Sequence, residues 1–406
     1  MPKAVLACME LLIRRKHDLI SNEDWELLCQ LQPHIEDFKQ NGNYGNMELM
    51  AMGAMQFSLT HNMFNKDFVA AMYARVLTNS LTLITPTLDP LGIILDPTIG
   101  HINHSCNPNA YIIMDGPEVS IRTLTPVKKD EEIYISYVDT TNPFHRRQSE
   151  LQARWFFSCK CTKCQKGATL DEDRWCIEPK NLSDKTRLVA DALVKQEELS
   201  EDSANHVGET GDEKRVAAIQ GRAFAAYEEE QRIVDPQGAI EVIQGTMQFC
   251  HETGLWPMYR QPLAALRDDL IVGLLSVRSY RVAFTQCAMR YKHILPKLYP
   301  VHFHPIRVVQ TWQMAMLATY LANTEDIKES DINMGLIAMM LVRQVLDASN
   351  LSHGADSAFT KSVRQKAEEM IEELKRMVGD PDKEVMNREL ELQKDMLMQM
   401  GDSVKV

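Results

Sequence analysis

The chain has 406 residues, 45% of them hydrophobic, which is enough for two or three domains with buried cores. Its 56 acidic and 44 basic side chains give a formal net charge of -12, which argues against unaided nucleic-acid binding and tolerates a basic peptide partner, although an ordinary acidic protein carries the same charge. Nine cysteines without a secretory signal, and no run of about 18 apolar residues, favour a reducing compartment and argue against a membrane span.

Helical periodicity dominates the first 78 residues. Residues 4–16 carry apolar side chains at helical spacing, and Ser21 suits the N-cap of a following helix. Between Glu48 and Leu83 the apolar density continues with few helix-breaking residues, which predicts further helices. This part of the chain is therefore expected to be helical.

The pattern changes between about residues 84 and 140, where Pro and Gly interrupt short runs rich in Ile, Val and Tyr. The runs at 111–113, 119–121 and 133–137 predict strands, and Asp115-Gly116 predicts a hairpin turn. We expect a small β domain.

The C-terminal half returns to helical patterns. Residues 196–214 are rich in Glu, Asp and Ser, which predicts a solvated acidic loop. Apolar residues at helical spacing over 309–320 and 332–345 predict a helix pair of the kind found in helical-hairpin arrays. The segment beyond Asp380 predicts one more helix.

Three cysteines, Cys159, Cys161 and Cys164, have metal-ligand spacing. Thiolates at positions i, i+2 and i+5 can wrap a single cation, and tetrahedral zinc needs four such ligands. The fourth ligand could be Cys106 or Cys176, and Cys176 is the closer in sequence. Three reduced surface thiols are the alternative, but exposed free thiols are liable to oxidation. The spacing predicts a zinc site and leaves its fourth ligand open.

Three motifs together carry a resemblance to a known family. They are the string NHSCNPNA at 103–110, the run Ile135-Ser136-Tyr137-Val138-Asp139, and the cysteine trio. Their order and spacing resemble the SET domain with its post-SET zinc module, and more narrowly the SET and MYND domain (SMYD) class of protein lysine methyltransferases, especially fungal ones. The resemblance covers residues 79–166 strongly and the flanking helices weakly.

The resemblance implies an α+β fold. Its expected parts are a helical SET-insert-like region at 1–78, a SET core at 79–140, a post-SET zinc module at 141–168 and a C-terminal helical (TPR-like) domain at 169–406. No glycine-rich G-x-G turn precedes Gly42, and only Cys8 and Cys29 precede the β region. We therefore expect this chain to lack the N-terminal G-x-G lobe and the MYND finger of the class.

The resemblance also assigns ligands to residues. It makes Cys106 the fourth zinc ligand beside the cysteine trio, in preference to Cys176. The family's Asn-His pair contacts S-adenosylmethionine at a pseudoknot-like crossing of the chain, which implies that Asn103 and His104 bind the cofactor. Asn79 lies in a segment similar to the one whose asparagine also holds the cofactor, and Phe157 is expected against the adenine.

The reacting end of the site is assigned in the same way. Tyr137 matches the family's catalytic tyrosine, and Trp155 is expected to line the lysine channel. Methyl transfer from a sulfonium needs a neutral amine and a straight approach, so positioning supplies much of the acceleration. Taken one at a time, each of these aromatic residues is more simply read as core packing.

Three functions follow as hypotheses. The first is an S-adenosylmethionine-dependent protein-lysine N-methyltransferase, acting on a histone or another protein, in the nucleus, the cytoplasm or both. The second is a catalytically impaired SET-derived scaffold that binds protein partners through its helical domain. The third is a zinc-stabilised helical adaptor unrelated to methyl transfer.

Overall fold

The computed structural model describes residues 1–169, 182–199, 211–324, 332–379 and 382–404. The chain divides into two compact units. The first comprises Met1–Thr140 and Arg146–Gln165, and the second comprises Thr141–His145 and Lys166–Val406. Within the described residues, no helix is both long enough and apolar enough to cross a membrane.

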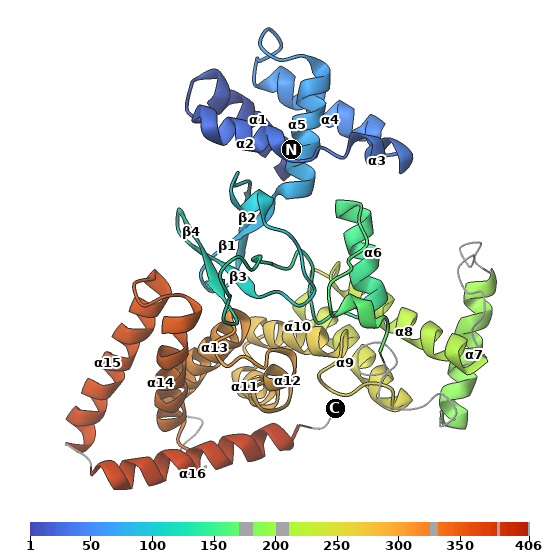
Figure 1. The fold of residues 1–406 in the computed structure, drawn as a ribbon. Helices are drawn as coiled ribbons and strands as arrows, with labels where there is room; N and C mark the ends of the chain where they lie inside the picture. Colours follow the sequence, from blue (N-terminus) through green and yellow to red (C-terminus); the bar gives the residue numbers. More distant parts are fainter. Residues whose placement is uncertain (170–181, 200–210, 325–331, 380–381, 405–406) are drawn as a thin grey trace. The chain divides into compact units, whose positions relative to one another are not determined.

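The N-terminal part of the first unit is helical, as predicted (Figure 1). Ser21 caps the second helix as expected, because its hydroxyl accepts a hydrogen bond from the Asp24 amide at 3.0 Å. The apolar faces of the first, fourth and fifth helices enclose a core that includes Leu12, Ala54 and Ala74. The helices are α1 (Lys3–Lys16), α2 (Asn22–Gln30), α3 (Ile35–Gln40), α4 (Tyr44–Phe57) and α5 (Lys66–Asn79).

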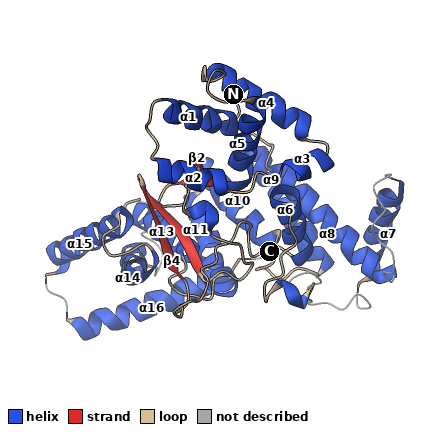
Figure 2. Cartoon of the chain, turned by 45° about the horizontal axis from the view of Figure 1, so that its top comes forward, coloured by secondary structure: helices blue, strands red, loops and turns tan. Residues whose placement is uncertain are grey.

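The strands of the first unit form two separate antiparallel hairpins, drawn in red in Figure 2. One pairs β1 (Leu81–Ile84) with β2 (Pro90–Ile94), and the other pairs β3 (Ala110–Asp115) with β4 (Glu118–Thr123). The predicted hairpin is present, but its turn lies one residue later than expected. Asp115 still pairs with Glu118, so the turn residues are Gly116 and Pro117, and Gly116 takes a positive φ of +63°. A short 3₁₀ helix, η1 (Ile99–His101), follows the first hairpin.

Two further predictions for this unit were wrong in detail. The helix expected to reach Leu83 ends at Asn79, because the apolar run that follows pairs as β1. The strand expected over 133–137 is irregular, with only an isolated parallel bridge from Ile135 to His104, because its neighbour is a loop and not a strand. The remaining elements of the first unit are α6 (Phe144–Trp155) and the 3₁₀ helix η2 (Cys164–Lys166), although Phe144, His145 and Lys166 are grouped with the second unit.

The second unit is helical throughout its described part. Its elements are α7 (Asp184–Leu199), α8 (Gly211–Glu230), α9 (Pro236–Thr253), α10 (Leu263–Ser276), α11 (Tyr280–Met289), the π-helix η4 (Arg290–Ile294), α12 (Leu295–Leu298), α13 (Pro305–Ala322), α14 (Met334–Ser352), α15 (Ala358–Val378) and α16 (Lys383–Asp402).

Most predictions for this unit are confirmed. The expected helix pair is α13 packed on α14, and the small side chains of Ala315 and Ala318 are fully buried. The final predicted helix is α16. The acidic loop expected over 196–214 was too long at both ends, because α7 continues to Leu199 and α8 begins at Gly211; residues 200–210 lie outside the described residues.

Candidate functional site

Two segments of the first unit cross each other at the centre of the candidate site. The backbone amide of Ser105 donates to the carbonyl of Ile135 at 2.9 Å, and the Ile135 amide donates to the carbonyl of Asn103 at 3.1 Å. Further along, the Ala110 amide donates to the Tyr134 carbonyl at 3.1 Å. Backbone hydrogen bonds therefore join the motif at 103–110 to the segment that carries Tyr137.

Asn109 and Glu132 hold this crossing from its exposed side. The Asn109 side chain donates to the Glu132 carbonyl at 2.9 Å and accepts from the Tyr134 amide at 2.8 Å. The Glu132 carboxylate accepts from the Asn103 amide and from the Tyr134 hydroxyl, both at 2.6 Å. The hydrogen bonds from Tyr134 and Asn103 lower the pKa of Glu132.

The sequence reasoning missed these two residues. Asn109 belongs to the NHSCNPNA string, which is a signal in itself, whereas the role of Glu132 depends on the crossing. Tyr134 is partly buried, and its hydroxyl donates to the Glu132 carboxylate.

Tyr137 lies at the inner end of the crossing. Its hydroxyl donates to the Ile102 carbonyl at 2.6 Å. Burial raises the pKa of Tyr137 to about 12, so the phenol is neutral at physiological pH and remains a hydrogen-bond donor. Its ring centroid lies 5.3 Å from that of Trp155 and 6.5 Å from that of Phe157.

His104 joins Tyr137 to the cysteine cluster. Its Nδ1 accepts a hydrogen bond from the Tyr137 backbone amide at 3.0 Å, and its Nε2 lies 3.2 Å from the Cys106 Sγ. Burial, with a smaller effect of the positive charge on Arg147, lowers the pKa of His104 to about 4. The imidazole is therefore neutral at physiological pH.

The three aromatic residues at the end of α6 point to different surroundings. Phe156 has a left-handed backbone with φ of +60°, which is uncommon for a bulky residue. Its ring packs at 5.2 Å from His34 and 5.0 Å from Phe38, against the helical core. This turn of the chain lets both Trp155 and Phe157 lie near the Tyr137 ring, and sequence reasoning gave Phe156 no such role.

The structure brings the four cysteines of the predicted zinc site together. The Sγ atoms of Cys106, Cys159, Cys161 and Cys164 all lie within 4.8 Å of one another. Three of the four residues are buried and Cys161 is partly buried. Four converging sulfurs match the donor set and number of a structural zinc site. Cys176, the alternative fourth ligand, lies outside the described residues.

The local electrostatics of the cluster also suit a metal. Burial raises the pKa of Cys161, but backbone and side-chain hydrogen bonds, first from Cys164, outweigh it and lower the value to about 6. Burial raises the pKa of Cys106, so a cation is needed to keep that sulfur as a thiolate. The Gln148 side chain accepts from the Cys159 amide at 2.9 Å and donates to its carbonyl at 3.1 Å, which fixes the loop.

Two predicted cofactor residues lie at the edge of this arrangement. Asn103 is exposed and bound to Glu132. Asn79 lies at the end of α5, where its amide donates to the Arg75 carbonyl at 3.0 Å and to the Thr78 hydroxyl at 2.9 Å. The hydrogen bonds of Asn79 thus stay within its own helix, while His104, Tyr137, Trp155 and Phe157 form one cluster.

Comparison with known proteins finds a domain match and several relatives. Residues 10–138 match the SET domain family. The fission yeast protein called SET domain and MYND-type zinc finger protein 6 is 32% identical over 143 residues, which are 35% of this chain and 29% of that protein. Human N-lysine methyltransferase SMYD2 is 32% identical over 120 residues, 30% of this chain and 27% of that protein.

A longer match extends through the helical part. Histone-lysine N-methyltransferase ASHR1 of Arabidopsis thaliana is 25% identical over 363 residues, which are 86% of this chain and 70% of that protein. The chain thus covers less than a third of the yeast and human relatives and more than two thirds of the plant one. The resemblance to the SET domain is confirmed: this chain contains a SET domain, and its relatives include proteins named SMYD and SET domain and MYND-type zinc finger proteins.

Proposed function

We propose that this chain is an S-adenosylmethionine-dependent protein-lysine N-methyltransferase. The observation that carries the proposal is the Tyr137 hydroxyl, held by the Ile102 carbonyl at 2.6 Å inside a cluster of aromatic rings in a SET domain. A neutral phenol and a backbone carbonyl side by side are the polar groups that can orient a lysine amine without acting as acid or base.

The remaining residues of the cluster have roles consistent with this chemistry. S-adenosylmethionine, when bound, supplies a methyl group on a sulfonium that a neutral amine can attack in line. The partly buried ring of Phe157 beside His104 offers a flat apolar surface that fits an adenine, and Asn103 and Asn79 supply polar contacts at the rim. The Trp155 ring, 5.3 Å from Tyr137, can line the path of the lysine side chain and favour its cationic end before deprotonation.

Zinc would be held by Cys106, Cys159, Cys161 and Cys164 and would take no part in the reaction. Since the four sulfurs saturate a tetrahedral ion, no ligand position remains open for substrate. Its contribution is structural, because it fastens the loop after α6 to the crossing segment that carries Cys106.

A basic protein tail is the substrate class that suits this chain best. The formal net charge of -12 attracts Lys- and Arg-rich segments. Relatives are named histone-lysine or N-lysine methyltransferases, which supports a histone or another lysine-containing protein as substrate. We propose the nucleus, the cytoplasm or both as its place of action.

Calorimetric titration of the zinc-loaded chain with S-adenosylmethionine tests the cofactor half of the proposal. We expect one site with micromolar affinity, weakened at least about tenfold in Asn103→Ala, because one hydrogen-bonding amide is worth about 1–2 kcal/mol. Asn46→Ala, an exposed change on α4, is the matched control and should bind as the wild type does. No heat with the wild type would contradict the enzyme and favour a scaffold.

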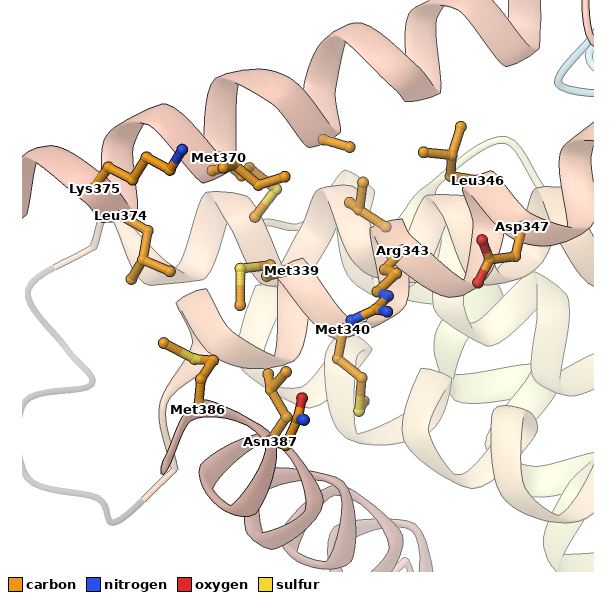
Figure 3. A pocket seen from close by; sticks show the side chains of 14 residues that line it. Met339, Met340, Arg343, Leu346, Asp347, Met370, Leu374, Lys375, Met386 and Asn387 are labelled. Carbon is orange, nitrogen blue, oxygen red and sulfur yellow. The ribbon is translucent and has the colours of Figure 1, made fainter. Parts of the chain in front are cut away.

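A second candidate function, binding of protein partners through the helical unit, has one observation in its favour. Helices α14, α15 and α16 line a cavity of about 670 Å³ (Figure 3). Its walls include four methionines, which adapt readily to different apolar partners: Met339, Met340, Met370 and Met386. This candidate would be supported if the wild-type chain binds no S-adenosylmethionine but binds a protein partner, and if Met370→Glu abolishes the binding of that partner.

A further inference from the structure

We propose that His104 is a positioning residue that couples the zinc site to Tyr137. The inference rests on the proposed function for the role of Tyr137, while its zinc half stands on the geometry alone. A single imidazole lies between the Cys106 sulfur and the Tyr137 backbone amide, with one ring nitrogen facing each.

The two contacts fix the tautomer of the ring. Because Nδ1 accepts from the Tyr137 amide, it carries no proton, and an imidazolium is excluded by the same contact. The ring proton therefore lies on Nε2, which points at the Cys106 Sγ at 3.2 Å. The ring orientation follows as well, since a flipped ring would set carbon atoms against both partners.

The surroundings make this bridge rigid. His104 is 9% exposed and Cys106 is 1% exposed, so water does not compete effectively for either contact. The backbone of His104 also pairs with Ile135 in a parallel bridge, two residues before Tyr137. The imidazole therefore cannot turn away from one partner without breaking with the other.

The hydrogen bond to sulfur gives His104 a role towards the metal. A thiolate that accepts a hydrogen bond from a fixed donor is held in place for coordination, and loss of such a partner typically costs 10–100-fold in metal affinity. Through Nδ1, the same ring holds the Tyr137 backbone amide at a fixed position relative to the Cys106 sulfur. The Tyr137 hydroxyl then reaches the Ile102 carbonyl.

Two half-replacements separate the two contacts. In His104→Asn the side-chain oxygen can still accept from the Tyr137 amide, but the donor to sulfur is lost. In His104→Gln the longer amide can still donate to sulfur, but the acceptor for Tyr137 is lost. His104→Phe removes both and keeps the ring volume, and His353→Phe, a histidine 4% exposed in the helical unit, is the matched control.

Zinc release to a chromogenic chelator, and the sulfur-to-metal charge-transfer band of the cobalt-substituted protein, report the first contact. We expect His104→Asn and His104→Phe to release zinc about 10–100-fold faster and to shift the cobalt band, and His104→Gln and His353→Phe to match the wild type. Release rates and cobalt spectra of His104→Asn and His104→Phe equal to those of the wild type would overturn the proposal, whether or not the chain is an enzyme.

Amide exchange at Tyr137, read by NMR on tyrosine-labelled protein, reports the second contact. We expect the Tyr137 amide to exchange at least about tenfold faster in His104→Gln and His104→Phe, and at nearly the wild-type rate in His104→Asn. In His104→Gln and His104→Phe the fold-decrease in kcat should exceed the fold-change in KM for S-adenosylmethionine. Unchanged exchange in His104→Gln would refute the coupling. If the wild type transfers no methyl group, the proposed function is wrong, but zinc release and amide exchange still test the role of His104.

Discussion

Phe156 shows how a single residue can set the site. Its left-handed backbone, with φ of +60°, costs on the order of 1 kcal/mol, and its ring contacts with Phe38 and His34 compensate for this strain. Phe156→Ala keeps the strain and loses the contacts, so we expect a loss of roughly 3 kcal/mol in the free energy of unfolding, measured in urea.

The matched variant is Phe156→Leu, which keeps most of the volume and should lose less than half as much. We also expect weaker S-adenosylmethionine binding in Phe156→Ala, because Trp155 and Phe157 flank this residue. An alanine variant that unfolds at the wild-type urea concentration would show that Phe156 has no such role.

Tyr137 carries the reaction in this account. We expect Tyr137→Phe to lower kcat about 10²-fold while S-adenosylmethionine binds within about twofold, since the hydroxyl orients the amine and the aromatic ring remains. Methyl transfer to protein under saturating cofactor measures the effect, with Tyr44→Phe on α4 as the control. An active Tyr137→Phe variant would mean that another group orients the amine.

At the scale of elements, the caps of the helices add a dependence on pH. His304 caps α13 by accepting from the Ile306 amide at 3.3 Å, and burial lowers the pKa of His304 to about 4. The folded state therefore binds fewer protons than the unfolded chain, whose histidines titrate near 6.5, so acidification favours unfolding. Stability from this group is complete above about pH 6.5 and is lost as the pH falls towards 4.

We expect the helical unit to lose on the order of 2 kcal/mol between pH 6.5 and 4 through His304. His304→Asn keeps a capping acceptor but does not titrate, so its unfolding free energy should change less over this range. Urea unfolding of both proteins at pH 6.5 and 4.5 measures the difference. Parallel losses in the two proteins would rule out His304 as the cause.

Local patterns predicted elements well where the partner was close in sequence. The α1 helix, the Ser21 cap, the β3–β4 hairpin and the spacing of Cys159, Cys161 and Cys164 all depend on neighbours within a few residues. Pairing between segments far apart in sequence could not be predicted from local patterns. The segment at 133–137 has the composition of a strand, but its partner is the loop at 103–110. Residues 81–84 continue a helical pattern, but they form β1 because they pair with β2.

The same distinction holds within the candidate site. The role of Cys106 came from the family resemblance, because the sequence spacing alone favoured Cys176. The bonds of Asn109 and Glu132, the backbone of Phe156 and the bridge made by His104 all arise only when the two segments cross. The expected positions of cofactor and lysine substrate stay predictions.

At the scale of the molecule, the two compact units should respond differently to loss of metal. All four cysteines of the cluster belong to the first unit, while the helical unit has its own core around residues such as Leu270 and Leu341. Because zinc binding to a cysteine site is linked to folding, we expect a chelator to lower the unfolding temperature of one calorimetric transition by 10 °C or more and to leave the other unchanged.

Cys164→Ser should reproduce the effect of the chelator without any addition. Cys250→Ser, a buried thiol of the helical unit, is the control and should leave the transition of the first unit in place. If both transitions shift together after zinc removal, the units do not unfold independently. If neither shifts, the four sulfurs do not hold a structural metal.

Mass spectrometry of substrate proteins can detect the proposed methyl transfer to lysine itself. The zinc-loaded chain would be incubated with S-adenosylmethionine carrying a deuterated methyl group and with a mixture of core histones and cell-extract proteins. We expect deuterated methyl groups on lysine side chains with the wild type and at most about 1% as many with Tyr137→Phe. Bound cofactor without any labelled lysine, across both protein sources, would contradict the proposed methyl transfer.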